Sequence, residues 1–269
     1  MRAMDIAPPL PESSAAAVAR DRARVRYAVL GAGALLAGIW IVWFGAWLLG
    51  WSMDDLGIAP RHLRGLIGIL TAPFAHASFA HLMSNTLPMA LLATLTLYCY
   101  PRAARLALPL IWIASGIGVW LFARPSVHVG ASGIAHGLMF FLFVMGLIRR
   151  DRLAVVTSLV VFFLYGGMLL SVLPHEEHVS FEYHLAGAVA GVLAAILLHA
   201  RDPLPPRKHY SWEDEDLEAS AVDDELEPPR AQDVPVIWHR SVHDRDEDRV
   251  IAFRPRDPSD SPPPPPTLH

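Results

Sequence analysis

The sequence is poor in cysteine, and long stretches of it lack charge. Its one cysteine, Cys99, lies inside an apolar run, so an internal disulfide is impossible and the redox compartment cannot be inferred from it. Hydrophobic residues make up 53% of the 269 residues and gather in long runs without a charged side chain. Such runs are long enough to cross a bilayer, so the composition excludes a soluble domain and indicates a multi-span membrane protein.

No cleavable signal peptide is evident in residues 1–19. This segment contains Pro8, Pro9 and Pro11 and has no apolar core. We therefore expect the first membrane span to target the chain. The uncharged runs predict an all-α membrane protein with six spanning helices, over residues 27–53, 81–98, 106–123, 131–148, 153–173 and 183–200. The loop between the first two spans is weakly apolar and should lie in or against the membrane interface.

Basic residues predict the orientation of these six spans. The loops on the side of the N-terminus carry twelve Lys and Arg residues, whereas the opposite loops carry only Arg61, Arg64 and Arg124. Cytoplasmic loops of membrane proteins are enriched in Lys and Arg. We therefore expect a multi-pass protein of the plasma membrane with both termini in the cytoplasm, and the even-numbered spans then begin at the outer face.

Composition divides the chain into three parts. Residues 1–26 form a short cytoplasmic segment, and residues 27–201 form the six-span core. Residues 202–269 carry 17 acidic and 8 basic residues, many prolines and few apolar residues. Such a segment cannot bury enough apolar surface to offset the entropy of folding, so a disordered, acidic, Pro-rich cytoplasmic tail is expected.

A serine between small residues opens the fourth expected span. The order is Gly130, Ala131, Ser132, Gly133, which places Ser132 at a helix start near one membrane face. Backbone N–H groups without helical partners and the positive end of the helix dipole gather there, and both can stabilise a developing oxyanion. By itself such a serine is more often part of a helix-packing seam than a nucleophile.

Three further polar residues are expected at the depth of Ser132. His81 and Asn85 are spaced i, i+4 at the outer end of the second span, and His184 lies at the outer end of the sixth. Several polar residues converging inside a membrane predict a functional site. The imidazole of His184 can take the hydroxyl proton of Ser132, and His81, Asn85 and the Ser132 N–H can stabilise an oxyanion.

A carboxylate that could orient His184 is missing from the expected spans. Glu182 is the nearest, but two residues away on a helix it would point to another face. The sequence therefore predicts a dyad of Ser132 and His184. No cofactor and no nucleic-acid partner are expected.

Close packing of the fourth and sixth spans is required if the dyad is to form. Each span carries glycines four residues apart, a pattern that lets two backbones approach closely. These pairs are Gly133 with Gly137 and Gly187 with Gly191.

Together these motifs resemble the rhomboid family of intramembrane serine proteases. The matching pieces are the segment from His76 to Asn85, the Gly130 to Gly133 motif, and His184 followed by Gly187 and Gly191. The resemblance extends over residues of roughly 28 to 200. It implies a six-helix bundle, a Ser132 and His184 dyad, an oxyanion site from His81, Asn85 and the Ser132 amide, and cleavage of single-span membrane proteins near the outer face.

Two positions depart from the family pattern. Leu63 stands where relatives have a tryptophan before the arginine matched by Arg64, and His136 replaces an aromatic residue that stacks on the catalytic histidine. These departures bear on the level of activity. Imidazole can still stack, but its N–H and nitrogen lone pair can alter the orientation or basicity of His184.

Two other functions, a silent relative and a transporter or channel, are compatible with a six-span protein, and one loop segment resembles a metal site. A catalytically silent relative would bind membrane clients without cleaving them. The presence of both Ser132 and His184 argues against this alternative. A transporter would be indifferent to loss of Ser132, and the broken paired helices typical of that class are not evident. A metal site at residues 175–178, His-Glu-Glu-His, lacks the usual metalloprotease spacing, so a solvated loop is expected and no metal is predicted.

Overall fold

The computed structural model describes residues 15–174 and 179–204, which belong to one compact unit, Met1–Lys208. Most of the segment expected to be disordered, and the His-Glu-Glu-His segment at residues 175–178, lie outside the described residues. Within the described ranges the regular elements are helices, and an isolated antiparallel bridge joins Ile58 and His128.

Six helices of the described part are long and apolar enough to cross a membrane, which confirms the predicted all-α, six-span architecture. Their bounds are α1 Ala15–Leu49, α3 Phe79–Cys99, α4 Pro101–Phe122, α5 Ser132–Arg149, α6 Arg152–Tyr165 continued by the 3₁₀ turn η3 Gly166–Val172, and α7 Phe181–Leu198. The connection from α1 to α3 contains three short helices, η1 Met53–Leu56, α2 Gly65–Thr71 and η2 Ala72–Phe74.

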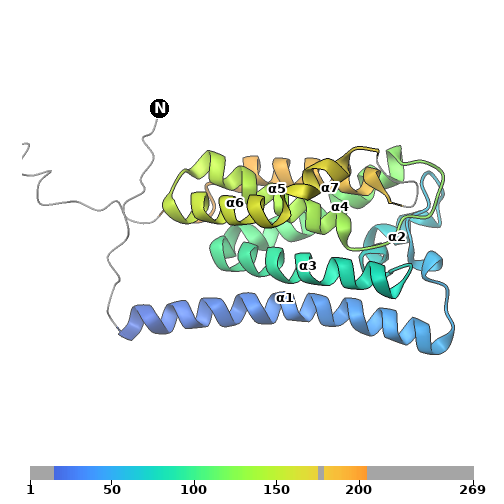
Figure 1. The fold of residues 1–269 in the computed structure, drawn as a ribbon, viewed down its shortest axis with the longest axis horizontal. Coiled ribbons are helices and arrows are strands. Elements are labelled where there is room, and N and C mark those ends of the chain that lie inside the picture. Colours follow the sequence, from blue (N-terminus) through green and yellow to red (C-terminus); the bar gives the residue numbers. More distant parts are fainter. Residues whose placement is uncertain (1–14, 175–178, 205–269) are drawn as a thin grey trace, which may run out of the picture. The chain divides into compact units, whose positions relative to one another are not determined.

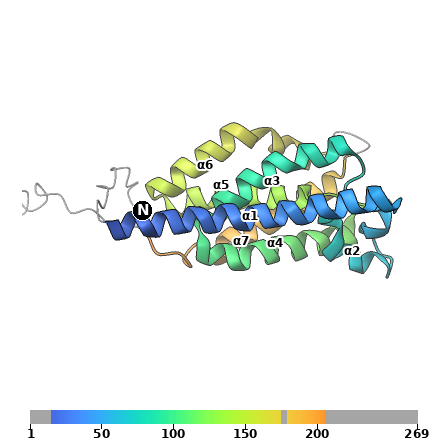
Figure 2. The same ribbon diagram turned by 90° about the horizontal axis from the view of Figure 1, so that it is seen from below.

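Helix α5 is the centre of the bundle. It packs against α3, α4, α6 and α7, and more of its length is buried than that of any other spanning helix described. Large apolar side chains such as Leu138, Met139 and Phe141 are fully enclosed along it. Helix α1 lies along one side of the bundle next to α3 (Figure 1, Figure 2). The helix that Ser132 begins is therefore largely shielded from lipid by its neighbours.

Helix α1 begins at Ala15, twelve residues before the predicted start of the first span at residue 27. The arginines that suggested a non-spanning segment are accommodated on the helix surface. Arg24 donates to the carbonyl of Cys99 at 3.1 Å and lies over the ring of Tyr98, whose hydroxyl donates to Asp21 at 2.9 Å. Long basic side chains can thus extend a helix beyond its apolar run.

Asp202, the first residue of the predicted tail, is buried against the start of α4. Its carboxylate accepts the backbone N–H groups of Arg102 and Ala103 at 3.0 and 2.9 Å, at the start of α4. Arg149 donates to the carbonyls of Asp202 and His199 at 2.7 and 2.9 Å. The carboxylate satisfies N–H groups at a helix start that have no partner within the helix, which explains why this acidic residue is buried.

Candidate active site

The serine and the histidine singled out in the sequence begin two neighbouring helices. Ser132 is the first residue of α5, and His184 lies in the first turn of α7. The two helices run in the same direction through the bundle, because one more antiparallel span separates them in the chain. Ser132 and His184 therefore lie at the same end of the bundle.

Glycines bring the backbones of α5 and α7 into direct contact. A Cβ atom at Gly187 would overlap the carbonyl oxygen of Gly133, and one at Gly191 would overlap the carbonyl oxygen of Gly137. The four glycines that suggested a packing seam thus face one another in two pairs, one helical turn apart. In the first pair, Gly133 directly follows Ser132, and Gly187 lies three residues after His184.

An imidazole connects Ser132 with His184. His136, one turn after Ser132, has its Nδ1 2.7 Å from the Ser132 carbonyl oxygen. Its ring stacks on the ring of His184, with centroids 3.9 Å apart and planes inclined by 12°. Only 3% of His136 and 8% of His184 are exposed, so this stack is enclosed by the bundle.

His81 and Asn85 lie on α3 beside the turn that leads into Ser132. Gly130 has a φ of +116°, a conformation that favours glycine, and a Cβ atom there would lie 2.7 Å from Cε1 of His81. The His81 ring therefore packs on the backbone of Gly130. Asn85 donates from Nδ2 to the His81 carbonyl at 2.9 Å and keeps a second amide hydrogen for another acceptor.

His128 holds the segment that precedes Ser132. It is 2% exposed, exchanges backbone hydrogen bonds with Ile58 at 2.9 and 3.0 Å, and places Nδ1 2.6 Å from Oγ of Ser180. Ser180 caps the start of α7 by accepting the N–H of Tyr183. Burial lowers the pKa of His128, an effect that its contact with the Arg124 carbonyl opposes. His128 therefore ties the approach to α5 to the start of α7.

Ser171 is a site residue that the sequence did not indicate. It lies on η3, and its carbonyl oxygen is 3.0 Å from Nδ1 of His184. Every residue has a backbone carbonyl, so the sequence could not single out this one as a partner of His184. Leu63, the departure from the family pattern in the first loop, is 83% exposed and contributes nothing to the enclosed site.

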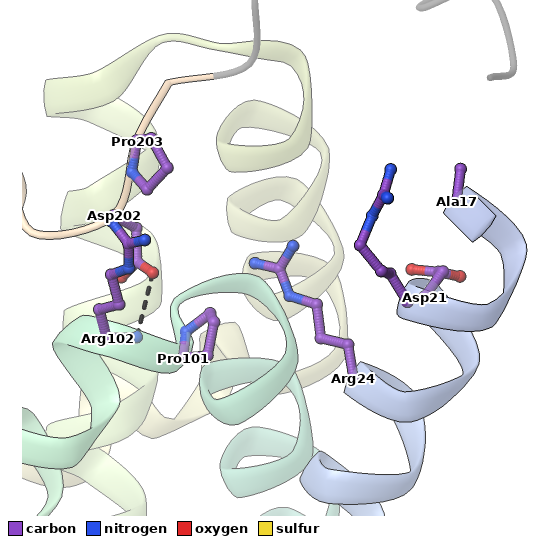
Figure 3. Close-up of a pocket in the computed structure, with 8 residues that line it drawn as sticks. Ala17, Asp21, Arg24, Pro101, Arg102, Asp202 and Pro203 are labelled. Carbon is purple, nitrogen blue, oxygen red and sulfur yellow. Dashed lines mark hydrogen bonds between the residues drawn. The ribbon is translucent and has the colours of Figure 1, made fainter.

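A cavity of about 440 Å³ lies at the opposite end of the bundle (Figure 3). It is lined by residues at the starts of α1 and α4, among them Arg24 and Arg102, and by Asp202 and Pro203. Because α4 runs from this end toward the end where α5 begins, the cavity is separate from Ser132 and His184.

These features define a polytopic membrane protein with a partly buried serine and a buried histidine at one end of its central helices. The Rhomboid domain model matches residues 63–201, just over half of the chain. The chain belongs to the rhomboid family, which confirms the resemblance inferred from the motifs.

Several mycobacterial proteins are similar to this chain. "Uncharacterized protein Rv1337" of Mycobacterium tuberculosis is 42% identical over 170 residues, which cover 60% of this chain and 69% of the relative. "Uncharacterized protein ML1171" of Mycobacterium leprae is 36% identical over 166 residues, covering 58% of this chain and 64% of that protein. Their names assign no activity.

Proposed function

We propose that this protein is an intramembrane serine endopeptidase that cleaves single-span membrane proteins in or next to their transmembrane helix. The observation that carries the proposal is the stack that joins the two helices. His136 bonds to the carbonyl of Ser132 while its ring lies 3.9 Å from that of His184. Membership of the rhomboid family, whose members are generally serine proteases of this kind, supports the same assignment.

In the proposed reaction, Ser132 is the nucleophile and His184 is the general base. His184 Nε2 takes the hydroxyl proton as Oγ forms a bond to the substrate carbonyl carbon. The tetrahedral intermediate collapses, the C–N bond breaks, and the proton on Nε2 passes to the leaving amine. A water molecule then gives a proton to His184 and attacks the acyl-enzyme, and the proton returns to Ser132 Oγ as the carboxyl product leaves.

The oxyanion is assigned to donors at the start of α5 and on α3. The N–H of Ser132 lies in the first turn of its helix, where backbone N–H groups lack helical acceptors. The free amide hydrogen of Asn85 and the imidazole of His81 supply side-chain donors from the neighbouring helix. Each such donor typically contributes about 3 kcal/mol to stabilisation of the transition state.

The substrates proposed are helices that can be unwound locally. A peptide carbonyl within a regular helix is already hydrogen-bonded, so small or helix-weakening residues near the cleaved bond should favour attack. We assign both termini to the cytoplasm and the site to the outer face of the plasma membrane, from the distribution of Arg and Lys in the loops.

Reconstitution with a generic single-span substrate tests the assignment. Ser132→Ala and His184→Ala should each lower cleavage by ~10³-fold or more, because the nucleophile or its base is lost. Ser115→Ala is the control, since Ser115 is a serine of a spanning helix whose hydroxyl donates to the carbonyl of Trp112 in its own helix. Cleavage by Ser132→Ala at the wild-type rate would contradict the proposal.

A catalytically silent client-binding protein is the second candidate. It is favoured by one observation, the imidazole of His136 at a position where the family has an aromatic ring. A serine-reactive fluorophosphonate probe separates the two candidates. Labelling that depends on both Ser132 and His184 supports the protease, and binding of substrate without labelling supports the silent relative.

A further inference from the structure

Ser171 contacts both stacked imidazoles through different atoms. Its carbonyl oxygen lies 3.0 Å from Nδ1 of His184, and its Oγ lies 2.8 Å from Nε2 of His136. We propose that Ser171 and His136 are positioning residues that fix the tautomer and the orientation of His184. This inference rests on the proposed function, because it concerns how the general base is held.

The partners of His136 determine where its protons lie. Its Nδ1 faces the carbonyl oxygen of Ser132 at 2.7 Å, and a carbonyl can only accept, so Nδ1 carries a hydrogen. Both hydrogen-bond partners of the ring are uncharged and the residue is buried, which favours the neutral ring. Nε2 then has a free lone pair and accepts the hydroxyl hydrogen of Ser171.

The same reasoning applies to His184. Its Nδ1 faces the carbonyl of Ser171, so Nδ1 carries the hydrogen and Nε2 of the neutral ring carries a lone pair. That lone pair is what a general base needs to take the proton of Ser132. The peptide carbonyl of Ser171 therefore does for His184 what a carboxylate does in a catalytic triad: it selects the tautomer and aligns the ring.

The hydroxyl of Ser171 has two possible acceptors. Oγ lies 2.9 Å from the carbonyl of Met168 in its own 3₁₀ turn and 2.8 Å from Nε2 of His136. One hydrogen cannot serve both acceptors, so the neutral His136 ring competes with the turn for it. By taking it, His136 holds η3 against the start of α5 and keeps the Ser171 carbonyl in reach of His184.

Nitrogen NMR of the full-length protein, labelled at histidine, tests the tautomers directly. Protonated and unprotonated ring nitrogens differ widely in chemical shift, and His136→Phe and His184→Ala assign the signals. We expect hydrogen on Nδ1 in both rings at neutral pH. Hydrogen on Nε2 of His184 would overturn the proposal.

Kinetics test whether positioning matters for turnover. Ser171→Ala keeps the carbonyl but removes the hydroxyl that bonds to His136, and it should lower kcat about tenfold with little change in KM. Ser171→Thr should restore most of that loss, because it keeps the hydroxyl. His136→Phe keeps a stacked ring without either hydrogen bond and should resemble Ser171→Ala.

Ser115→Ala is again the control. Ser115, like Ser171, has a carbonyl oxygen three residues earlier within hydrogen-bond distance of its hydroxyl, at 3.0 Å, but no described contact joins it to either imidazole. It should leave kcat unchanged. If Ser171→Ala and Ser115→Ala have the same kcat, the positioning role is wrong.

Failure of this inference differs from failure of the proposed function. If Ser132→Ala retains cleavage, the protease assignment fails whatever tautomer His184 adopts. If Ser132→Ala is inactive and Ser171→Ala retains full activity, the protease assignment stands and only the positioning role is lost.

Discussion

His76 is a buried histidine beside the site for which the proposed chemistry has no use. Only 1% of it is exposed, neither ring nitrogen has a hydrogen-bond partner among the described residues, and its ring centroid lies 5.0 Å from that of His81. Burial, and then the neighbouring imidazole of His81, lower the pKa of His76 to about 4. The residue should therefore make stability depend on pH.

The sign follows from where the proton binds. Between pH 6.5 and about 4 the unfolded chain protonates His76 and the folded chain does not, so stability falls as pH falls and levels off below pH 4. The loss amounts to about 3 kcal/mol in the free energy of unfolding. Unfolding in detergent at a series of pH values measures it. His76→Phe should reduce the change of unfolding free energy with pH. His62→Phe, at an exposed histidine, should leave that pH dependence unchanged. Equal pH dependence in wild type and His76→Phe would contradict the assignment.

At the scale of elements, the contact between α5 and α7 determines whether the site forms. Gly187 and Gly191 of α7 lie directly against backbone carbonyls of α5, so no flexible side chain there could yield to an added methyl group. Overpacking that forces a backbone shift typically costs about 1–3 kcal/mol and occasionally more.

Gly187→Ala should therefore lower both stability and cleavage, because its methyl group pushes α7 away from the carbonyl of Gly133. We expect a loss of about 3 kcal/mol in the free energy of unfolding. Gly33→Ala is the control, since a Cβ atom at Gly33 in α1 meets nothing within 4 Å and alanine favours a helix by about 1 kcal/mol. An equal effect of the two changes would show that the helix contact is looser than described.

Much of this architecture could be predicted from the sequence because it depends on composition. Uncharged runs locate the spans, and the shared depth of Ser132 and His184 follows from counting them. The extension of α1 back to Ala15 was not predicted, because a helix can carry arginines beyond its apolar run. The burial of His128 and the role of Ser171 could not be predicted. Both depend on hydrogen bonds of backbone groups, which every residue type has.

For the whole molecule, orientation in the membrane can be measured with single cysteines. The buried Cys99, 3% exposed, is the only cysteine, so new cysteines can be probed in an otherwise native chain. Asp55 in the loop after α1 and Arg105 in the first turns of α4 are both exposed and lie at opposite ends of the bundle.

A membrane-impermeant maleimide distinguishes the two ends. In intact cells, Asp55→Cys should react, because its loop is assigned to the outer face, and Arg105→Cys should react only after lysis. The wild-type chain, with Cys99 alone, measures the background. The reverse pattern would place Ser132 and His184 at the cytoplasmic face.

The turn at Gly130 has a consequence for suppressor genetics. Any side chain at this residue would both strain the backbone and displace the imidazole packed on it. A second mutation that shrinks residue 81 relieves the crowding alone and removes a proposed oxyanion donor while doing so. Selections that begin from an inactive Gly130 allele should therefore return true revertants at codon 130 and no compensating change at codon 81.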